Sequence, residues 1–445
     1  MNGLIFKTKR LFLFAGDIIG LYLALYLTLV ARNWGELAPE SWLAHTQAFS
    51  VIFILWLIVF YINDLYDLKG SYNNANLLRE LSKSLIISGI IAVLAFYFLT
   101  PFFPSIKPQR VLIIDLFFSF AILFAWRKVF YGFLKSSQIA NKVLILGRHA
   151  LTDELAKAVE LRPQLGYKME RLDVAPENLK QYCSDNQIDI LVTTENFNID
   201  SETARKIFDC LSLGLDIYKI EAFYELITQK IPVEHIEVGW FLENLTENSK
   251  KSYEIFKRLL DLVLAFIGLV LTAPLVPLIA LIIKLESRGP VIFKQIRVGR
   301  DGNEFLAMKF RSMVADAEKN GAQWATKNDP RVTRFGRLMR KTRLDEIPQL
   351  INILRGEMSL IGPRPERPEF VEMLAKEIPF YRERLLINPG LTGWAQLLGP
   401  SYGGSKEESL EKLKFDLYYI KNRSLMLDLS IILKTLRVVL GGKGQ

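Results

Sequence analysis

Four long apolar runs occupy most of the N-terminal part of the chain. Residues 11–31, 41–63 and 85–103 contain one acidic side chain between them, Asp17, and the shorter run 111–126 contains Asp115. A helix of about 20 apolar residues is long enough to cross the hydrocarbon core of a bilayer. The pattern therefore predicts a four-helix transmembrane module over residues 1–135, in which the fourth helix is the least regular.

Basic side chains are distributed unequally around these runs. The loops after the first and third runs contain only Arg32, Lys107 and Arg110, whereas the other flanks contain Lys7, Lys9, Arg10, Lys69, Arg79, Lys83, Arg127, Lys128, Lys135 and Lys142. Loops rich in Lys and Arg stay on the cytoplasmic side, so both ends of the module are expected there. The first run is longer than the apolar part of a signal peptide, which has about 7–15 residues, and it is expected to be a retained anchor.

Asp17 and Asp115 are acidic side chains inside apolar runs. Such residues are costly in a membrane and often mark functional sites, so one hypothesis places the two carboxylates face to face. Polar packing inside the bundle, or a side chain reaching the interface near a helix end, is the more common situation and is the interpretation favoured here.

After Lys142 short apolar segments alternate with amphipathic ones. Residues 143–146, 188–192 and 215–220 are expected to be strands, and residues 152–161 and 201–213 to be helices. This alternation predicts a small Rossmann-like sheet within residues 140–240.

The first of these strands runs into Gly147, Arg148, His149 and Ala150. A dinucleotide site needs G-x-G-x-x-G at this point, because the backbone must approach the pyrophosphate closely. Only one of the three glycines is present, so the domain is expected to be a degenerate nucleotide-binding domain with a structural or regulatory role. His149 either meets an anionic ligand at the helix start or is a solvated loop residue.

A further apolar run covers residues 262–283 and has basic residues at both ends. It contains Pro274 and Pro277, which remove backbone donors and bend a helix. A crossing helix here would place everything after Lys284 outside the cell. The sequence predicts instead a re-entrant hairpin over residues 257–284, with both ends cytoplasmic, inside a C-terminal domain of residues 250–445.

The amino-acid composition excludes several classes of protein and of functional site. The chain has 445 residues, half of them apolar, and a formal net charge of +9. Its mean hydropathy of +0.19 is too high for a disordered chain. Two cysteines (Cys183 and Cys210) and three histidines (His45, His149 and His235) are too few for a Cys/His zinc site or a disulfide framework.

Residues 327–343 contain seven basic side chains and one acid. Arg331, Arg334, Arg337 and Arg340 recur every three residues, and on a helix they would form a slowly drifting stripe. Such a stripe suits the phosphates of a substrate or of lipid headgroups. Nucleic-acid binding and a merely solvated face are the alternatives, and the membrane segments favour lipid or substrate phosphate.

Asp345 and Glu346 follow this stretch directly. A proline before residues 349–354 and a glycine after them predict a helix there, so the two acids lie at its N-terminus, where capping is their usual role. Arginines precede them and Gly-Pro-Arg-Pro follows at residues 362–365. In that setting one carboxylate can attack phosphorus while the other holds Mg²⁺.

Four segments of the C-terminal region stand out in this order: Lys309-Phe310-Arg311-Ser312-Met313, Arg343-Leu344-Asp345-Glu346-Ile347-Pro348-Gln349-Leu350, Arg355-Gly356-Glu357-Met358-Ser359-Leu360-Ile361-Gly362-Pro363-Arg364-Pro365-Glu366 and Pro389-Gly390-Leu391-Thr392-Gly393-Trp394-Ala395-Gln396. They resemble the bacterial sugar transferases that are polyprenyl-phosphate phosphoglycosyl transferases. The four-helix module and the Rossmann-like domain look like those of the large members, which initiate exopolysaccharide synthesis.

The resemblance implies an α/β membrane enzyme of the bacterial inner membrane whose monotopic catalytic domain faces the cytoplasm. Its partners would be a UDP-sugar, undecaprenyl phosphate and membrane lipids, and not nucleic acid; a homodimer is left open. The enzyme would transfer sugar-1-phosphate to the lipid and release UMP.

Residue by residue, the resemblance makes Asp345 the nucleophile of a covalent phosphosugar intermediate and Glu346 the magnesium ligand. The matched substrate- or phosphate-binding residues are Lys309, Arg311, Arg340 and Arg364. The Ala273-Pro274 break matches the family's re-entrant helix. After Gln396 the chain departs from the Val-Asn-Gly-Arg of many members, so sugar or uridine contacts are not carried over to residues 397–404. Asp416 and Tyr419 are weaker site candidates.

Other enzyme classes fit less well. The chain has no D-x-D pair for a conventional glycosyltransferase and no P-loop. Its middle domain, residues 140–240, has neither the Gly-rich turn nor the Tyr-x-x-x-Lys pair of a nucleotide-sugar dehydratase. The residues alone leave open a direct transfer in which Asp345 is a general base. A non-enzymatic membrane scaffold or regulator is the alternative from a different class.

Overall fold

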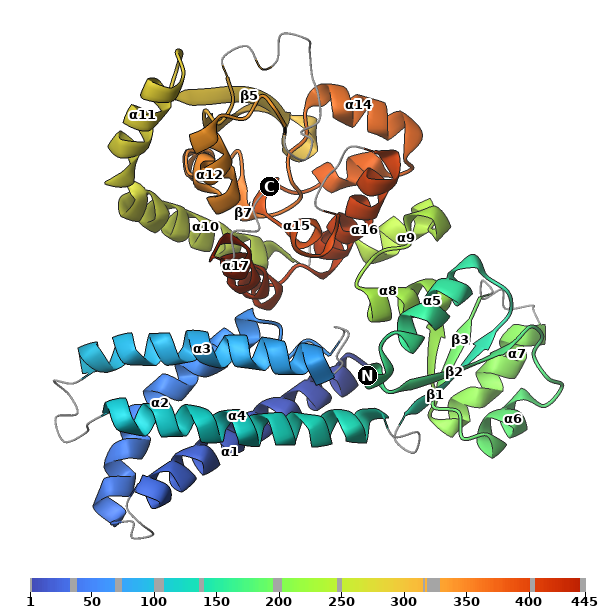
Figure 1. Cartoon of the computed structure of the whole chain (residues 1–445). Helices are drawn as coiled ribbons and strands as arrows, with labels where there is room; N and C mark the ends of the chain where they lie inside the picture. The colour runs from blue at the N-terminus through green and yellow to red at the C-terminus, as the bar shows by residue number, and fades with distance from the viewer. Residues whose placement is uncertain are drawn as a thin grey trace. The chain divides into compact units, whose positions relative to one another are not determined.

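The computed structural model describes residues 2–32, 38–68, 74–99, 108–135, 140–194, 202–245, 250–314, 317, 329–400 and 405–440. The chain forms two compact units, Met1–Thr228 and Gln229–Gln445 (Figure 1). The first unit contains long helices and a parallel sheet. The second contains the four segments that resemble the sugar transferases.

The first unit begins with four long helices, α1 (Asn2–Arg32), α2 (Pro39–Ile62), α3 (Asn74–Leu99) and α4 (Pro108–Lys135). Among the described residues, three helices have the length and apolar composition of a membrane span: Thr8–Arg32, Pro39–Ile62 and Asn74–Phe98. The prediction of a membrane protein is confirmed. α4 is helical as expected, but it contains Asp115, Arg127 and Lys128, and its crossing of the membrane stays a prediction.

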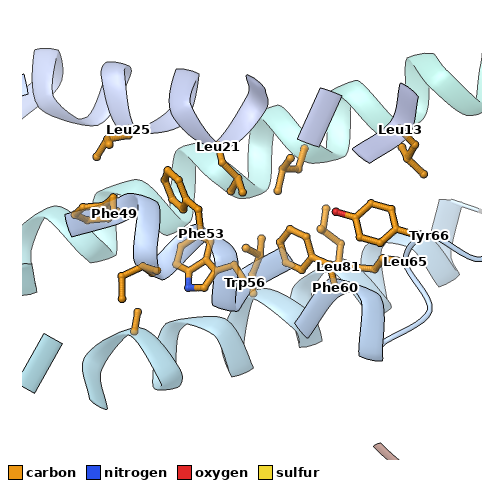
Figure 2. Packing of buried hydrophobic residues seen from close by; sticks show 14 of the residues in the cluster. Leu13, Leu21, Leu25, Phe49, Phe53, Trp56, Phe60, Leu65, Tyr66 and Leu81 are labelled. Carbon is orange, nitrogen blue, oxygen red and sulfur yellow. The ribbon is translucent and has the colours of Figure 1, made fainter. Parts of the chain in front are cut away.

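Leucine and aromatic side chains fill the interior between these helices (Figure 2). Leu21 of α1 packs in one buried cluster with Phe49, Phe53 and Trp56 of α2. The Phe53 ring lies 5.8 Å from Phe49 and 5.6 Å from Trp56 between centroids. Outward positions are apolar as well, among them Leu23, Ile54, Ile90 and Phe117. A bundle that is apolar inside and outside is suited to lipid.

The carboxylate of Asp17 is buried and pairs with Arg127 of α4. Arg127 also donates a hydrogen bond of 2.6 Å to the carbonyl of Leu65. Asp115 lies twelve positions before Arg127 on the same helix, about 18 Å along its axis. The hypothesis that Asp17 and Asp115 face each other is therefore wrong. The partner of Asp17 is an arginine, which offsets the cost of burying either charge alone.

The rest of the first unit is a four-stranded parallel sheet in the order β2-β1-β3-β4. Its strands are β1 (Asn141–Leu146), β2 (Tyr167–Leu172), β3 (Ile190–Thr193) and β4 (Asp216–Lys219). One face packs on α5 (Ala150–Glu160) and α8 (Ile220–Thr228), and the other on α6 (Leu179–Asp185) and α7 (Glu202–Asp209). The predicted parallel α/β sheet is confirmed.

β2 and α6 are elements that the sequence pattern did not predict. β2 reads YKMERL, and Tyr167 is its one buried side chain. An edge strand has one neighbour and faces solvent along much of its length, so it needs no regular apolar alternation. Without that alternation the periodicity that marks a strand is absent.

The turn after β1 is shaped by Gly147 and His149. Gly147 has a φ of 96°, and a Cβ at this position would lie 2.1 Å from Oγ1 of Thr194. Nδ1 of His149 accepts a hydrogen bond of 3.2 Å from the backbone N of Leu151. His149 is thus the cap of α5, which neither of the two predicted roles described.

The second unit contains α9 (Val238–Asn244) and then two apolar helices, α10 (Lys251–Thr272) and α11 (Leu275–Glu286), which are bent by 64°. The break falls at Ala273 and Pro274, as the proline pattern predicted. The pair exposes many apolar side chains, among them Ile255, Phe256, Leu259, Val263, Phe266, Leu278, Leu281 and Leu285. Whether it enters and leaves one face of a membrane stays a prediction.

Two small sheets organise the remainder of this unit. β5 (Ile292–Val298) pairs antiparallel with β6 (Glu304–Phe310), and β7 (Ser359–Ile361) pairs parallel with β8 (Gly390–Thr392). The helices are α12 (Arg334–Thr342), α13 (Gln349–Arg355), α14 (Pro368–Glu377), α15 (Trp394–Leu398), α16 (Lys406–Asn422) and α17 (Leu425–Leu440). Buried Ile361, Val371, Tyr419 and Ile431 belong to the core that holds β7 to α14, α16 and α17.

Candidate active site

Asp345 and Glu346 lie on a short 3-10 turn, Leu344–Glu346, between α12 and α13. Pro348 directly precedes α13, and Gly356 follows it with a φ of 84°. The helix predicted from the proline and the glycine is confirmed. The two acids therefore lie just before its first turn, where free backbone N–H groups favour negative charge.

The arginine stripe is only partly helical. The side chain of Thr333 caps Gly336, so α12 begins at Arg334 and Arg331 lies before it. The stripe expected on a helix therefore forms over Arg334, Arg337 and Arg340 and does not include Arg331. Arg334 and Arg337 are exposed.

Glu346 is a buried carboxylate held by cationic side chains. Its Oε1 accepts a hydrogen bond of 2.9 Å from Nζ of Lys309 and one of 2.8 Å from Nη2 of Arg364. Nη1 of Arg343 lies 3.6 Å from the same oxygen. Lys309 comes from β6 and Arg364 from the turn after β7, so segments far apart in the sequence meet at one carboxylate.

Asp345 is also buried, with 6% of its surface exposed. Its Oδ1 has no hydrogen-bond partner among the described residues. A buried carboxylate oxygen without a partner is costly, and groups of this kind are concentrated at sites of chemistry or ligand binding.

The pKa values of the two carboxyl groups are shifted in opposite directions. Burial raises the pKa of Asp345, and the adjacent Glu346 raises it further. Burial also acts to raise the pKa of Glu346, but Lys309, Arg364 and Arg343 together hold it well below its usual range. Glu346 is thus the first of the pair to ionise, and Asp345 ionises more readily when additional positive charge arrives.

Arg340 is the member of the arginine series close enough to Asp345 for charge coupling. Its Nε donates a hydrogen bond of 2.9 Å to Oγ of Ser312. Burial lowers the pKa of Arg340, and Asp345 partly offsets this. Within the described residues neither Nη group of Arg340 makes a hydrogen bond, so both can donate hydrogen bonds to a bound anion.

Arg311 lies away from this cluster. Its Nη2 donates to the carbonyls of Ser287 at 2.6 Å and Ile283 at 3.4 Å, and its Nη1 donates to that of Pro290. These carbonyls lie in the last turn of α11 and just after it. Arg311 therefore caps the bent helix pair, and its expected place on the substrate phosphate stays a prediction.

The turn that presents Arg364 is fixed by close backbone packing. The N of Gly362 donates to the carbonyl of Thr392 at 2.9 Å, and the N of Gly390 donates to that of Pro363 at 2.8 Å. A Cβ on Gly390 would lie 2.1 Å from the N of Gly362. Glycine is required in both segments because the two backbones touch.

Arg384 supports the same turn, and no sequence motif pointed to it. Its Nη2 donates to the carbonyl of Arg364 at 3.0 Å and to Oδ2 of Asp416 at 2.8 Å, and its Nη1 donates to the hydroxyl of Tyr381 at 2.9 Å. Asp416, a weaker candidate from the resemblance, is thus a partner of Arg384 and makes no hydrogen bond to the Asp345–Glu346 pair.

The described part of the chain contains no group of three or more His, Cys, Asp or Glu side chains able to hold a metal ion. Mg²⁺, however, commonly binds one or two carboxylates and fills its remaining positions with water and substrate phosphates. Oε2 of Glu346 makes no hydrogen bond to a described residue. A carboxylate oxygen is a ligand that Mg²⁺ binds, so Glu346 is the member of the pair that could hold the ion.

Parts of several predictions fall outside the described residues. Among them are Lys69 and Lys107 of the charge distribution, the end of the third apolar run at 100–103, residue 201 of a predicted helix, Lys327 of the basic stretch, residues 401–404 of the departing loop and residues 441–445 of the C-terminal domain.

Residues 252–442 match the model of the bacterial sugar transferase family. The chain is 41% identical over 249 residues to the UDP-N-acetylgalactosamine-undecaprenyl-phosphate N-acetylgalactosaminephosphotransferase of Aeromonas hydrophila, which is 56% of this chain and 57% of that protein. It is 44% identical over 182 residues to the UDP-glucose:undecaprenyl-phosphate glucose-1-phosphate transferase of Escherichia coli (strain K12), which is 41% of this chain and 39% of that protein.

A shorter relative is matched over most of its length. The chain is 40% identical over 188 residues to the exopolysaccharide production protein PSS of Rhizobium leguminosarum bv. phaseoli, which is 41% of this chain and 93% of that protein. By contrast, the chain spans 57% and 39% of the Aeromonas and Escherichia proteins. Because the match covers 93% of a relative at 40% identity and residues 252–442 fit the family model, the chain belongs to the bacterial sugar transferase family.

Proposed function

We propose that this chain transfers a sugar-1-phosphate from a UDP-sugar to undecaprenyl phosphate, releases UMP and so initiates a surface glycan such as an exopolysaccharide. The observation that carries the proposal is the buried Oδ1 of Asp345, which has no partner among the described residues, beside a Glu346 that two cations neutralise. Relatives named as undecaprenyl-phosphate sugar phosphate transferases support it.

The first step is an attack by ionised Asp345. Its Oδ1 forms a bond to the sugar-bearing phosphorus of the UDP-sugar, while the bond from that phosphorus to the bridging oxygen breaks. UMP leaves with that electron pair. The product is a sugar phosphate joined to Asp345 as a mixed anhydride.

The second step returns the enzyme to its starting state. A phosphate oxygen of undecaprenyl phosphate attacks the same phosphorus, and the bond to the Asp345 carboxylate breaks. The sugar then stands on the lipid through a diphosphate, and Asp345 is again a free carboxylate. Because the acceptor attacks as an anion, the step needs no general base.

Cationic side chains make an attack by one anion on another feasible. Lys309 and Arg364 neutralise Glu346, and the unused Nη groups of Arg340 can bind phosphate oxygens. Mg²⁺ held through Oε2 of Glu346 would supply further neutralisation of the diphosphate. UDP-sugars are cytoplasmic, so the catalytic unit would face the cytoplasm from the bacterial inner membrane.

The experiment measures UMP release by purified protein with magnesium, with and without undecaprenyl phosphate. The donors are UDP-N-acetylgalactosamine and UDP-glucose, after the relatives' names, together with UDP-N-acetylglucosamine and UDP-galactose. Asp345→Asn and Glu346→Gln are expected to lose at least about 10³-fold in rate. Glu372→Gln, an exposed acid of α14, is the matched control and should be unaffected.

The outcomes separate the candidate mechanisms. Donor labelled at the sugar phosphate should leave label on the wild-type protein without acceptor, and none on Asp345→Asn. A fully active enzyme that never carries label would favour direct transfer with Asp345 as a general base. If no donor gives UMP, or if Asp345→Asn keeps full activity, the proposal fails and a membrane scaffold becomes the better interpretation.

A further inference from the structure

Helix α10 contacts the helix that follows the Asp345–Glu346 pair. Arg258 of α10 donates from Nη1 to the carbonyl of Ile353 at 2.7 Å and from Nη2 to that of Leu354 at 2.9 Å. Both carbonyls lie in the last turn of α13. A guanidinium at a helix C-terminus satisfies carbonyls that have no partner inside the helix and also suits the helix dipole. Arg258 thus fixes the end of α13 opposite to the two acids.

The same helix also contacts the strand that leads to Arg364. One turn after Arg258, Oδ1 of Asp261 accepts a hydrogen bond of 3.1 Å from the N of Leu360 in β7. Asp261 is buried, with 4% of its surface exposed. Four residues after Leu360 the turn presents the Arg364 guanidinium to Glu346. One face of α10 therefore holds both chain segments that converge on this carboxylate.

A third contact fixes α10 itself. Asp428 of α17 is fully buried, and its Oδ2 accepts from the hydroxyl of Tyr253 at 2.7 Å and from Nζ of Lys257 at 3.2 Å. Its Oδ1 accepts from the hydroxyl of Tyr419 at 2.7 Å. Every one of these contacts is local to the second unit, so α10 has a defined position against the catalytic core.

The opposite face of α10 is apolar and exposed. Ile255, Leu259, Val263 and Phe266 have 46–72% of their surface exposed. The helix thus presents an apolar surface on one side. On the other side its charged residues Arg258 and Asp261 form hydrogen bonds with α13 and β7. A shift of its axis would move α13 and the Arg364 turn together.

We propose that Arg258 and Asp261 are positioning residues for the transfer: they tie α13 and the Arg364 turn to α10, so that Glu346 stays between Lys309 and Arg364. This inference rests on the proposed function. Neither side chain contacts Asp345 or Glu346 directly. Their effect comes through geometry, and misplacement of a reacting group by about 1 Å can cost 10²-fold in rate.

The test compares variants that break each tie with variants that keep it. Arg258→Met and Asp261→Ala remove the hydrogen bonds. Arg258→Lys keeps one donor, and Asp261→Asn keeps the oxygen that Leu360 needs. Lys251→Met removes an exposed charge from the same helix and is the matched control. The measurements are kcat, the KM for the UDP-sugar, the pH dependence of kcat/KM and the midpoint of thermal unfolding.

We expect Arg258→Met and Asp261→Ala to lower kcat by at least about tenfold with the KM changed less than about threefold, as for lost alignment. The loss should follow the hydrogen bond and not the size of the side chain, because Glu346 would move away from Arg364 once the tie to α10 is broken. Asp261→Asn and Lys251→Met should stay close to wild type in rate and in pH profile, with Arg258→Lys in between.

Two results would overturn the inference. One is a kcat of Arg258→Met and Asp261→Ala within about twofold of Lys251→Met. The other is a lower kcat that a smaller folded fraction accounts for, with Asp261→Asn lowered as far as Asp261→Ala, which would show a general structural role. If Arg258→Met does not fold, the Asp261→Ala and Asp261→Asn pair decides alone. A wild-type protein without lipid-dependent UMP release contradicts the proposed function itself, whereas an active wild type with unaffected variants contradicts only the positioning role.

Discussion

Nζ of Lys309 donates a hydrogen bond of 2.9 Å to Oε1 of Glu346, an oxygen that Arg364 also binds at 2.8 Å. The other member of the acidic pair, Asp345, has an oxygen without a hydrogen-bond partner among the described residues. The cations are therefore concentrated on the carboxylate that does not attack in the proposed mechanism. This asymmetry is what a site needs if one acid is to hold charge and metal while its neighbour stays available as a nucleophile.

The first prediction concerns pH. Lys309→Met removes a cation that lowers the pKa of both Glu346 and Asp345, so both pKa values should rise. The acidic limb of kcat/KM reports the later of the two ionisations, that of Asp345, and it should move up by about one pH unit. Lys309→Arg, which keeps the charge, should leave the limb near its wild-type position. An unshifted limb in Lys309→Met would show that Lys309 does not control the ionisation of the acidic pair.

The same shift has a consequence for stability. Because the folded pKa of Glu346 lies below its unfolded value of about 4.3, the stabilisation is fully present above that value. It is lost as pH falls through the lower, folded pKa. Thermal unfolding midpoints measured from pH 6 downward should therefore fall less steeply in Lys309→Met than in the wild type.

The second prediction concerns Arg384. Asp416→Ala would leave this buried guanidinium without its carboxylate, and we expect a loss of about 3–5 kcal/mol in the free energy of unfolding. The reason is an unpaired charge away from water. Glu377→Ala is the control, because Glu377 pairs with Lys406 at 3.8 Å and both are about half exposed; such a pair contributes about 0–1 kcal/mol. Equal unfolding midpoints for the two variants would contradict the prediction.

The third prediction concerns backbone contact at the Arg364 turn. A Cβ on Gly390 would lie 2.1 Å from the N of Gly362, so Gly390→Ala must push β8 away from the turn. We expect a destabilisation of about 1–3 kcal/mol and a loss of transfer activity as Arg364 moves from Glu346. In α9, a Cβ on Gly239 would meet nothing within 4 Å, so Gly239→Ala should leave both properties intact. A fully active Gly390→Ala would show that the turn tolerates this displacement.

Sequence predicted the features that depend on local chemistry. Pro348 and Gly356 bracket α13 through backbone constraints that act on near neighbours, and Pro274 marks the bend for the same reason. Arg311 shows the limit of this reasoning. Arg311 stands two positions after Lys309, and side chains two apart on a strand point to the same face. The strand β6 ends at Phe310, however, so this alternation does not extend to Arg311.

Partners far apart in the chain could not be predicted in this way. Asp17 pairs with Arg127, 110 residues away in the sequence, and Arg384 pairs with Asp416, 32 residues away. Each pair depends on how helices pack, and no local pattern records that arrangement. One sequence without relatives therefore gives candidate residues of the right chemical type, and the fold decides which of them meet.

The last prediction concerns the bent helix pair α10–α11. We expect both of its ends to lie on the cytoplasmic side, because basic residues flank it on both sides and the exposed apolar faces suit a hairpin that enters one leaflet. Lys251→Cys and Arg288→Cys place a thiol at exposed positions near the two ends. The native cysteines, Cys183 and Cys210, are buried and would be replaced by alanine.

An impermeant maleimide applied to intact spheroplasts should label neither cysteine, and permeabilisation should make both reactive. Ala38→Cys, an exposed position before α2, is expected on the outer face and serves as the positive control. Labelling of Arg288→Cys alone from outside would mean that α10 and α11 together cross the membrane. In that case Asp345 and Glu346 would lie on the side without UDP-sugars, and the proposed function would fail together with the topology.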